Sequence, residues 1–252
     1  MWHDARIAVI VPAYCEARLI GRTLKTIPDW VDLVYVVDDA SPDRTSDAVA
    51  AIHDPRVRCV RHQTNRGVGA AIVTGYWCAL RADANVLVVM AGDNQMDAGD
   101  LPKIVAPVAR DEADYVKGNR FVHPEAGCMP LGRRLAGRWL SRITRLATGL
   151  QVEDTQCGYT ALSARAARRL QLDGLWPRFG YPNDLLGMLA AENLRVAEAA
   201  VRPVYADEQS GVRPWHALTV AGVVARRWWL SRRAMRRPAA DVLDGRQRGH
   251  PA

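Results

Sequence analysis

Short runs of apolar, mostly β-branched residues alternate with segments of helical periodicity through the first half of this chain. A strand that is buried on both faces reads as an unbroken apolar run, which is typical of a parallel sheet. The alternation therefore predicts right-handed βαβ units and an α/β fold, with a mostly parallel twisted sheet and helices on both faces. The predicted strands are residues 6–11, 33–37, 57–61, 86–90 and 115–117, and the predicted helices are residues 19–30, 45–53, 67–81 and one that starts at Asp100.

The second half of the chain has a less regular pattern. Helices are predicted at residues 131–147, 164–171, 183–193 and about 215–237, and strands around residues 157–162 and 195–205. Because no internal repeat or flexible linker interrupts this order, we expect one domain at residues 1–237 and a flexible tail at 238–252. The domain divides into a regular half at residues 1–118, a less regular half at 119–214 and a basic C-terminal helix at 215–237.

Composition and charge exclude several classes of protein. Hydrophobic residues make up 49% of the chain, which supplies a sizeable core and excludes a disordered or disulfide-stapled protein. The five cysteines are scattered without a Cys-x-x-Cys pair, so we expect reduced thiols and no zinc or redox site. No apolar run approaches the roughly 18 residues of a membrane span, and no signal peptide is apparent. We therefore expect a cytoplasmic protein, able to lie peripherally on the inner face of the membrane.

The net charge of +7 is concentrated at the C-terminal end. From residue 210 onward the chain has nine arginines against two aspartates, so residues 1–209 carry no net charge. A neutral body argues against a nucleic-acid binder, whose basic surface would normally lie on the folded domain. A basic tail suits an anionic membrane surface, nucleic acid or solubility, and charge alone does not choose among them.

Polar residues follow the first two predicted strands, at the sheet edge where α/β proteins bind ligands. A nucleotide base could stack on Tyr14, while Glu16 and Asp39 could accept hydrogen bonds from a base or a ribose. A turn and solvated loop carboxylates explain the same residues without a ligand. The first strand is not followed by Gly-x-Gly-x-x-Gly, which argues against a dinucleotide-binding dehydrogenase.

The loop after the fourth predicted strand carries oxygen ligands at alternate positions. Asp93, Gln95 and Asp97 suit Mg²⁺ or Mn²⁺, with a diphosphate completing the coordination shell. A calcium-binding loop would need more carboxylates within a 12-residue frame. An ordinary polar loop is the alternative. The position beside the Asp38-Asp39 strand end favours a metal-bound nucleoside diphosphate.

Eight motifs follow one another along the chain. The first half contains VPAYCEA, VVDDASPDRT, NRGVGAA and AGDNQMDAGDL, and the second half contains KGNRF, VEDTQCGYTALS, YPNDLL and DEQSGVRPW. In this order they resemble glycosyltransferase family 2, which has a GT-A nucleotide-sugar fold with a Rossmann-like nucleotide-binding half. The second set resembles the polyprenyl-phosphate glycosyltransferase branch that includes dolichyl-phosphate mannose synthases. The resemblance implies a nucleotide-sugar half at residues 1–118 and an acceptor half at 119–214. The resemblance spans roughly residues 6–215.

The resemblance implies roles for the residues at the strand ends. The nucleoside would be bound by Pro12, Tyr14, Glu16 and Asp39, and the same pocket would be lined by residues 65–69, including Asn65, Gly67 and Gly69. Backbone N–H groups at that helix start would lie near the diphosphate. Asp93 and Gln95 match the metal-binding positions of the family's Asp-x-Asp-x-Gln pattern. Its first Asp is Ala91 here, which removes one carboxylate.

In the second half, the resemblance implies basic residues that bind phosphate oxygens, namely Arg120, Arg133 or Arg134, and Arg213. A guanidinium group binds such oxygens in a fork. Asp184 stands where the branch usually has Glu, and Pro182 replaces the Asp of that pattern, which leaves the role of Asp184 open. Asp154 is a candidate base toward a sugar acceptor.

Three hypotheses on function remain open. The first is an inverting, metal-dependent transferase that moves a hexose from a UDP- or GDP-sugar to a polyprenyl phosphate, with Mg²⁺ or Mn²⁺ as cofactor. The second keeps the fold but uses a soluble sugar, lipid or alcohol acceptor, with Asp154 or Asp184 as general base. The third is an inactive nucleotide-binding protein, which the loss of a carboxylate at Ala91 suggests.

The predicted C-terminal helix at residues 215–237 combines tryptophans with arginine pairs. Trp228 and Trp229 are flanked by arginines at 226–227 and 232–233. Tryptophan favours the headgroup boundary of a bilayer, and arginine attracts anionic lipid. The helix is therefore a candidate contact with an anionic membrane surface. Packing of the tryptophans on the domain, with solvated arginines, is the alternative.

Overall fold

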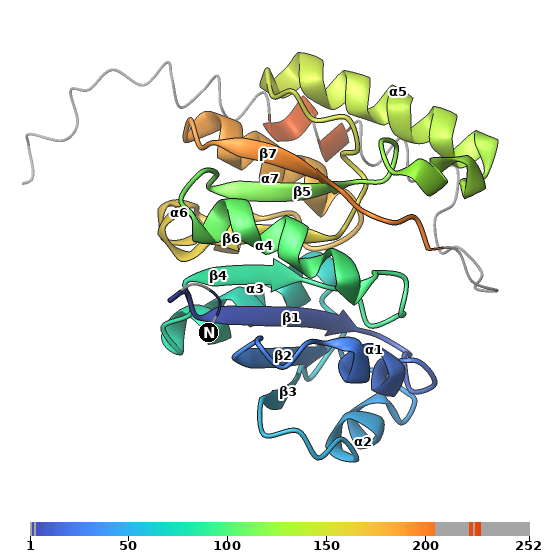
Figure 1. Cartoon of the computed structure of the whole chain (residues 1–252), viewed down its shortest axis with the longest axis vertical. Coiled ribbons are helices and arrows are strands. Elements are labelled where there is room, and N and C mark those ends of the chain that lie inside the picture. Colours follow the sequence, from blue (N-terminus) through green and yellow to red (C-terminus); the bar gives the residue numbers. More distant parts are fainter. Residues whose placement is uncertain (1, 3, 205–221, 224, 228–252) are drawn as a thin grey trace, which may run out of the picture.

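The computed structural model describes residues 2, 4–204, 222–223 and 225–227, and its elements follow the predicted alternation (Figure 1). The strands are β1 (Ile7–Ala13), β2 (Leu33–Asp38), β3 (Val57–Arg61), β4 (Val86–Val89), β5 (Tyr115–Asn119), β6 (Thr160–Ser163) and β7 (Val196–Ala200). The helices are α1 (Ile20–Thr26), α2 (Thr45–Ala50), α3 (Val68–Arg81), α4 (Leu101–Ala109), α5 (Leu131–Thr148), α6 (Ala164–Arg169) and α7 (Tyr181–Ala191). Short 3₁₀ turns are η1 (Ala98–Asp100), η2 (Pro124–Cys128) and η3 (Leu172–Gly174).

The described strands form one sheet in the order β3-β2-β1-β4-β6-β5-β7. Its neighbours pair in parallel except at β6, which runs antiparallel to both β4 and β5. The predicted mostly parallel sheet is thus confirmed. Because β6 is reversed, the segment that precedes it lies at the same edge as the carboxyl ends of the parallel strands. This edge carries the candidate site.

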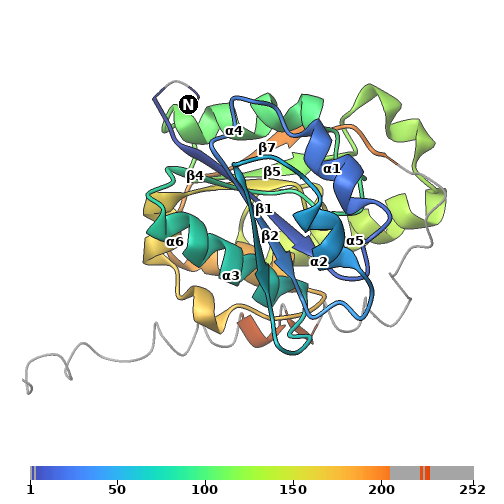
Figure 2. The same cartoon turned by 90° about the horizontal axis from the view of Figure 1, so that it is seen from below.

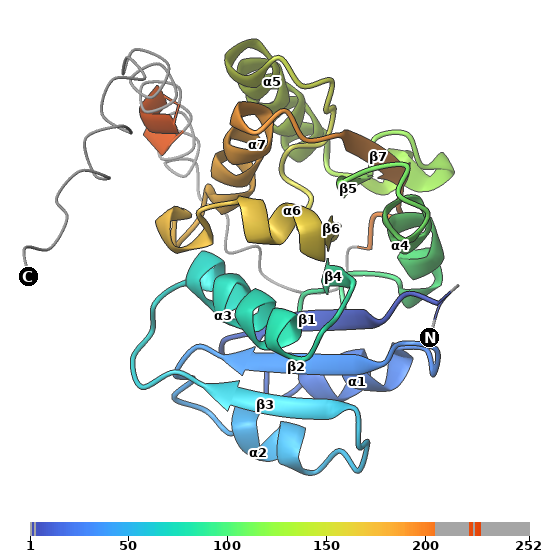
Figure 3. The ribbon, with the colours of Figure 1, turned by 90° about the vertical axis from the view of Figure 1, so that its left-hand side faces the viewer.

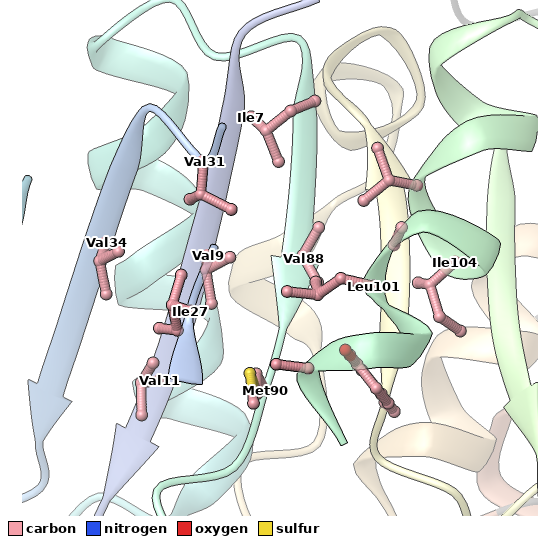
Figure 4. Close-up of a cluster of buried hydrophobic side chains, with 14 of the residues drawn as sticks. Ile7, Val9, Val11, Ile27, Val31, Val34, Val88, Met90, Leu101 and Ile104 are labelled. Atoms are coloured by element: carbon pink, nitrogen blue, oxygen red, sulfur yellow. The ribbon is translucent and has the colours of Figure 1, made fainter. Parts of the chain in front are cut away.

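Helices cover both faces of the sheet because its central strands are apolar on both sides. Along β1, Val9 and Val11 join a core cluster with residues of α1, α2 and α4, while Ala8 and Ile10 join a second cluster with residues of α3, α6 and α7. Figures 2 and 3 show these two helical layers, and Figure 4 shows the first cluster, with Leu101 of α4 beside the strands. The core therefore fixes the strands whose ends form the site.

A glycine allows α3 to approach β1 very closely, and its replacement gives a first prediction. A Cβ atom at Gly75 would lie 2.3 Å from Cγ2 of Ile10, a contact that the packed core cannot relieve without movement. We expect Gly75→Ala to lower the free energy of unfolding by about 1–3 kcal/mol, the usual cost of overpacking. The matched control is Gly132→Ala in α5, where nothing lies within 4 Å of the new Cβ. This helical position should gain up to about 1 kcal/mol in the same thermal-unfolding measurement, so equal shifts would contradict the close packing.

Candidate active site

Three loops at the carboxyl edge hold a non-glycine residue in the left-handed backbone region. These are Cys15 after β1 (φ 60°), Ala40 after β2 (φ 59°) and Asn94 after β4 (φ 59°). Such conformations are uncommon outside glycine, and they cluster at functional sites where the surrounding structure enforces them. The loops are also tied together, because Cys15 N donates to Ser41 Oγ (3.1 Å) and Glu16 N donates to Thr45 Oγ1 (2.9 Å).

The adjacent carboxylates of Asp38 and Asp39 are both buried and use separate sets of donors. Asp38 accepts hydrogen bonds from Ser41 N (2.8 Å), from the Ser46 hydroxyl and from Arg61 Nη1 (3.2 Å). These donors offset the mutual repulsion that two neighbouring carboxylates would otherwise suffer. Asp38 therefore stabilises the turn after β2, and Asp39 is the member of the pair that reaches toward the loop before α3.

The Asp39 carboxylate holds the loop before α3 by accepting hydrogen bonds from backbone N–H groups of that loop. Its carboxylate accepts hydrogen bonds from Arg66 N (2.9 Å) and Gly67 N (2.6 Å), and it also contacts Nδ1 of His62 (2.7 Å). Two residues further on, Gly69 N donates to Pro177 O (2.8 Å). The N–H groups of Gly67 and Gly69 at this helix start therefore donate to acceptors within the protein, and their predicted position near a diphosphate stays a prediction.

The glycines instead allow a close backbone approach. Gly67 adopts φ 97°, and a Cβ there would lie 2.4 Å from Pro177 O. A Cβ at Gly69 would lie 2.3 Å from Trp176 O. The side chain of Asn65 lies in the same region, 3.4 Å from Nη1 of Arg178. The segment before α7 thus packs against the predicted nucleoside loop, a contact between the two halves that sequence spacing does not reveal.

The predicted base-stacking residue is accessible at this edge. Tyr14 directly follows β1, and 48% of its surface is exposed. Pro12, by contrast, lies within β1, paired with Val37 of β2, so it shapes the strand end. A half-exposed aromatic ring beside a polar loop provides a surface on which a nucleotide base can stack.

The loop after β4 contains the predicted metal ligands Asp93 and Gln95. The backbone N–H of Gln95 donates to Asp93 Oδ1 (3.0 Å), which folds the loop around the carboxylate. Within the described part of the chain, no group of three or more His, Cys, Asp or Glu residues is arranged to hold a metal ion. The donor set of one carboxylate and one amide still fits Mg²⁺ or Mn²⁺, since Mg²⁺ is commonly bound through one or two carboxylates plus substrate phosphates.

The nearby Asp97 and a residue that sequence reasoning missed, Arg202, connect this loop to the second half. Asp97 accepts a hydrogen bond from Gly99 N (2.8 Å) and caps η1. Arg202 lies beyond β7, and its guanidinium is 3.7 Å from Asp97 Oδ2 and 2.9 Å from Glu125 Oε2. Arg202 therefore joins the β4 loop to η2, which leads into α5.

Arg120 and Asp154 form a bidentate ion pair at the carboxyl end of β5. Arg120 donates from Nε (2.7 Å), from Nη2 (2.9 Å) and from its backbone N (3.1 Å) to the fully buried Asp154 carboxylate. Glu198 of β7 accepts from the backbone N–H groups of Glu153 (2.9 Å) and Asp154 (3.0 Å), and burial raises its pKa. These hydrogen bonds fix the orientation of the Arg120 guanidinium, and the Asp154 carboxylate is shielded from solvent.

Asp184 has a similar environment at the start of α7. Its fully buried carboxylate receives hydrogen bonds from Arg227 Nε (2.6 Å) and Nη2 (2.7 Å) and from Trp176 N (2.8 Å). The predicted role of either Asp154 or Asp184 as general base does not agree with these positions. A base has to reach the proton it removes, whereas each carboxylate is buried and held by an arginine.

The other predicted arginines have different positions. Arg133 and Arg134 lie in the first turn of α5, and the buried Nε of Arg134 has no hydrogen-bond partner within the described part of the chain. Leaving such a donor unpaired costs free energy, so an anionic oxygen is a suitable partner. Arg213 and the greater part of the predicted helix at 215–237 lie outside the described residues. Arg227, from that helix, contacts the body of the protein through Asp184.

Lys117 is a second residue that the sequence analysis did not identify. It is fully buried in β5, and its Nζ donates to Cys157 O (2.6 Å). Burial lowers its pKa from 10.5 to about 8, against the opposing influence of Cys157, Asp154 and Glu198. Lys117 therefore places a titratable amine close enough to Asp154 and Arg120 for their charges to act on its pKa.

This pKa gives a prediction on pH dependence. Because the pKa of Lys117 is lower in the folded than in the unfolded chain, the unfolded state binds more protons between these values. The free energy of unfolding should therefore rise from about pH 8 to the pKa of an unfolded lysine, near 10.4. Chemical denaturation of the wild type and of Lys117→Met across this range isolates the effect as a difference. A constant difference between the two proteins would contradict the lowered pKa.

Comparison with known proteins matches this chain to sugar transferases. A family model described as glycosyl transferase family 2 matches residues 8–166. An undecaprenyl-phosphate mannosyltransferase of Micrococcus luteus is 32% identical over 204 residues, covering 78% of this chain and 82% of the relative. A UDP-N-acetylglucosamine–dolichyl-phosphate N-acetylglucosaminyltransferase of Methanococcus voltae is 28% identical over 220 residues, covering 81% and 88%.

Solved structures share the fold at lower identity. The glucosyl-3-phosphoglycerate synthase of Mycobacterium tuberculosis, in complex with phosphoglyceric acid, superposes with a TM-score of 0.70 at 20% identity, over 90% of this chain and 81% of that one. Another structure of the same enzyme, in complex with Mn²⁺, UDP and glucosyl-3-phosphoglycerate, has a TM-score of 0.69 at 19% identity. The predicted GT-A-type α/β fold is confirmed.

Proposed function

The chain belongs to glycosyltransferase family 2, and from this premise we propose that it transfers a sugar from a UDP- or GDP-sugar to a polyprenyl phosphate. One observation carries the choice of acceptor. Both carboxylates that could activate a hydroxyl acceptor, Asp154 and Asp184, are fully buried in bidentate pairs with arginines. A phosphate acceptor needs no such base, because a phosphate monoester is largely ionised near neutral pH. The named relatives of Micrococcus luteus and Methanococcus voltae act on acceptors of this class.

The first half of the chain binds the donor in this proposal. Tyr14 stacks on the base, and Glu16 and Asp39 line the nucleoside pocket. Asp93 and Gln95 would hold Mg²⁺ or Mn²⁺, with oxygens of the diphosphate completing the set of ligands. A bound divalent ion supplies positive charge against the diphosphate as it leaves. Ala91 leaves Asp93 as the single carboxylate among the motif's metal-binding positions, so the diphosphate has to supply more of the coordination shell.

The second half binds the acceptor and stabilises charge in the transition state. An acceptor phosphate oxygen attacks the anomeric carbon while the bond from that carbon to the diphosphate oxygen breaks, which inverts the configuration. Arg120, which Asp154 orients, and Arg134, whose buried Nε has no partner among the described residues, bind phosphate oxygens in this proposal. Arg133 is the alternative to Arg134 in this role, and Arg213 stays a predicted phosphate ligand. Asp154 and Asp184 act as positioning residues.

The test of this function is transfer of labelled sugar to undecaprenyl phosphate. The full chain is incubated with a panel of labelled UDP- and GDP-sugars, undecaprenyl phosphate in detergent, and Mn²⁺ or Mg²⁺. We expect one donor to give a labelled, organic-soluble product, with loss of the product when EDTA removes the metal. The absence of transfer and of donor hydrolysis across the panel would contradict the proposal.

Donor identity gives a further prediction, measured by thermal unfolding. A ligand at about 100 times its Kd stabilises the folded state by about 2.7 kcal/mol. For a chain of this length, this corresponds to a rise in Tm of roughly 5–11 °C. We expect one of UDP and GDP to produce this shift with Mn²⁺ and a smaller one with EDTA. Equal shifts by both nucleotides, independent of metal, would contradict a specific metal-bound diphosphate site.

A further inference from the structure

Helix α5 exposes large apolar side chains on the face opposite the one it buries. The described residues expose seven large apolar side chains in all, and four of them lie on this helix. They are Leu131, Leu135, Trp139 and Leu146, which are 64%, 58%, 58% and 81% exposed. Their spacings of four, four and seven residues place them along one side of a helix. We call these four residues the α5 stripe.

The opposite side of α5 is fastened to the candidate site. Ser141 Oγ accepts a hydrogen bond from Thr155 N (3.1 Å), next to the site residue Asp154. Thr144 Oγ1 receives a hydrogen bond from Asn183 Nδ2 (2.7 Å) in α7. Buried packing thus accounts for one face of the helix and leaves the α5 stripe outside the core. Figure 1 shows α5 along the outer edge of the molecule, beyond β5 and β7.

The charge on α5 matches an anionic surface. The helix carries five arginines and no acidic residue. Arg142 is exposed and lies between Trp139 and Leu146 along the stripe, and Arg138 is exposed beside it. An amphipathic helix that combines tryptophan and leucine with arginine is typical of segments that lie in the headgroup region of a bilayer. A second copy of α5 would bring like charges together, which disfavours a dimer through this face.

We propose that the α5 stripe binds the surface of an anionic lipid bilayer, with its apolar side chains among the lipid headgroups and its arginines on lipid phosphates. The described residues contain no helix that is long and apolar enough to cross a membrane. The first turn of α5 carries Arg133 and Arg134, so lipid contact along this helix places both arginines near the membrane surface. This surface differs from the one predicted on the C-terminal helix.

The proposal concerns lipid binding and is tested without sugar transfer. Flotation with vesicles of phosphatidylcholine and phosphatidylglycerol measures binding of the full chain. We expect Leu135→Ser/Leu146→Ser to lower the vesicle affinity at least about tenfold, which corresponds to about 1.4 kcal/mol. Trp139→Phe should retain most of the binding that Trp139→Ser loses. All four side chains are exposed, so the variants should keep the Tm of the wild type.

The matched control separates a local contact from net charge. Arg142→Glu in α5 and Arg168→Glu in α6 replace exposed arginines and change the net charge equally. We expect a loss of at least about tenfold for Arg142→Glu and less than about threefold for Arg168→Glu. Equal losses, or unchanged binding by the leucine double variant, would overturn the proposal. Sedimentation showing a lipid-free dimer that the same leucine substitutions dissociate would also overturn it, in favour of a second copy on this face.

Discussion

Asp93→Asn is expected to lower the rate of sugar transfer by about 100-fold or more. In the proposed site, Asp93 is the carboxylate that the chain retains from the motif expected to bind metal, since Ala91 replaces the other. The substitution would remove the negative charge that holds a divalent ion against the diphosphate, and loss of one such stabilising group typically costs about 10²–10³ in rate. The measurement is the initial rate of labelled transfer at saturating Mn²⁺, together with nucleotide binding in EDTA, which should change little.

The control for this variant comes from the same loop. Asp97→Asn removes an equal charge, yet asparagine can still accept the capping hydrogen bond that Gly99 N donates to Asp97 Oδ1. We expect a loss of transfer smaller than about tenfold. If both variants lose activity equally, the effect is general electrostatics of the loop and Asp93 has no special role at the metal.

Arg120→Met is expected to have the largest effect on stability. Asp154 is fully buried, so removal of the guanidinium takes away its ion-pair partner and leaves the backbone N–H of residue 120 and the charge of Lys117 to offset the buried carboxylate. Breaking such a pair from one side typically costs about 3–5 kcal/mol. For a chain of this size, this lowers Tm by roughly 6–20 °C. Differential scanning fluorimetry measures the shift, with Arg168→Met on the surface of α6 as a control that should change Tm little.

A double variant distinguishes the structural from the chemical role of Arg120. In Arg120→Met/Asp154→Asn the buried charge is gone, so most of the lost stability should return. Sugar transfer should stay low, because the guanidinium that binds phosphate oxygens is still absent. Recovery of transfer together with stability would show that Arg120 acts only through the fold.

The sheet could be predicted closely because burial on both faces produces unbroken apolar runs. β3 begins and ends at the predicted residues, and β1, β2 and β4 shift by no more than two residues. The helix expected at residues 19–30 ends at Thr26 instead, since Ile27 is already extended before Pro28. The strand expected around 157–162 begins only at Thr160. The residues before Thr160 belong to the loop at the site edge of the sheet, where the antiparallel β6 starts.

The contacts that define the site were beyond prediction because they join residues far apart in the chain. Arg120 and Asp154 are 34 residues apart, and Arg227 and Asp184 are 43 apart. Residue type alone suggested phosphate binding for Arg120 and base catalysis for Asp154 or Asp184, whereas the structure shows both aspartates paired with arginines. The role of Gly67 and Gly69 depends likewise on Pro177, which only the folded chain brings near.

The most direct test of the central claim compares acceptors in one assay. With the donor identified by thermal shift and Mn²⁺ present, initial rates are measured for undecaprenyl phosphate, for the corresponding polyprenol and for 3-phosphoglycerate. We predict transfer to undecaprenyl phosphate, with one nucleoside diphosphate released per sugar transferred, and no product from the other two acceptors. Transfer to the polyprenol or to 3-phosphoglycerate, with none to undecaprenyl phosphate, would contradict the account.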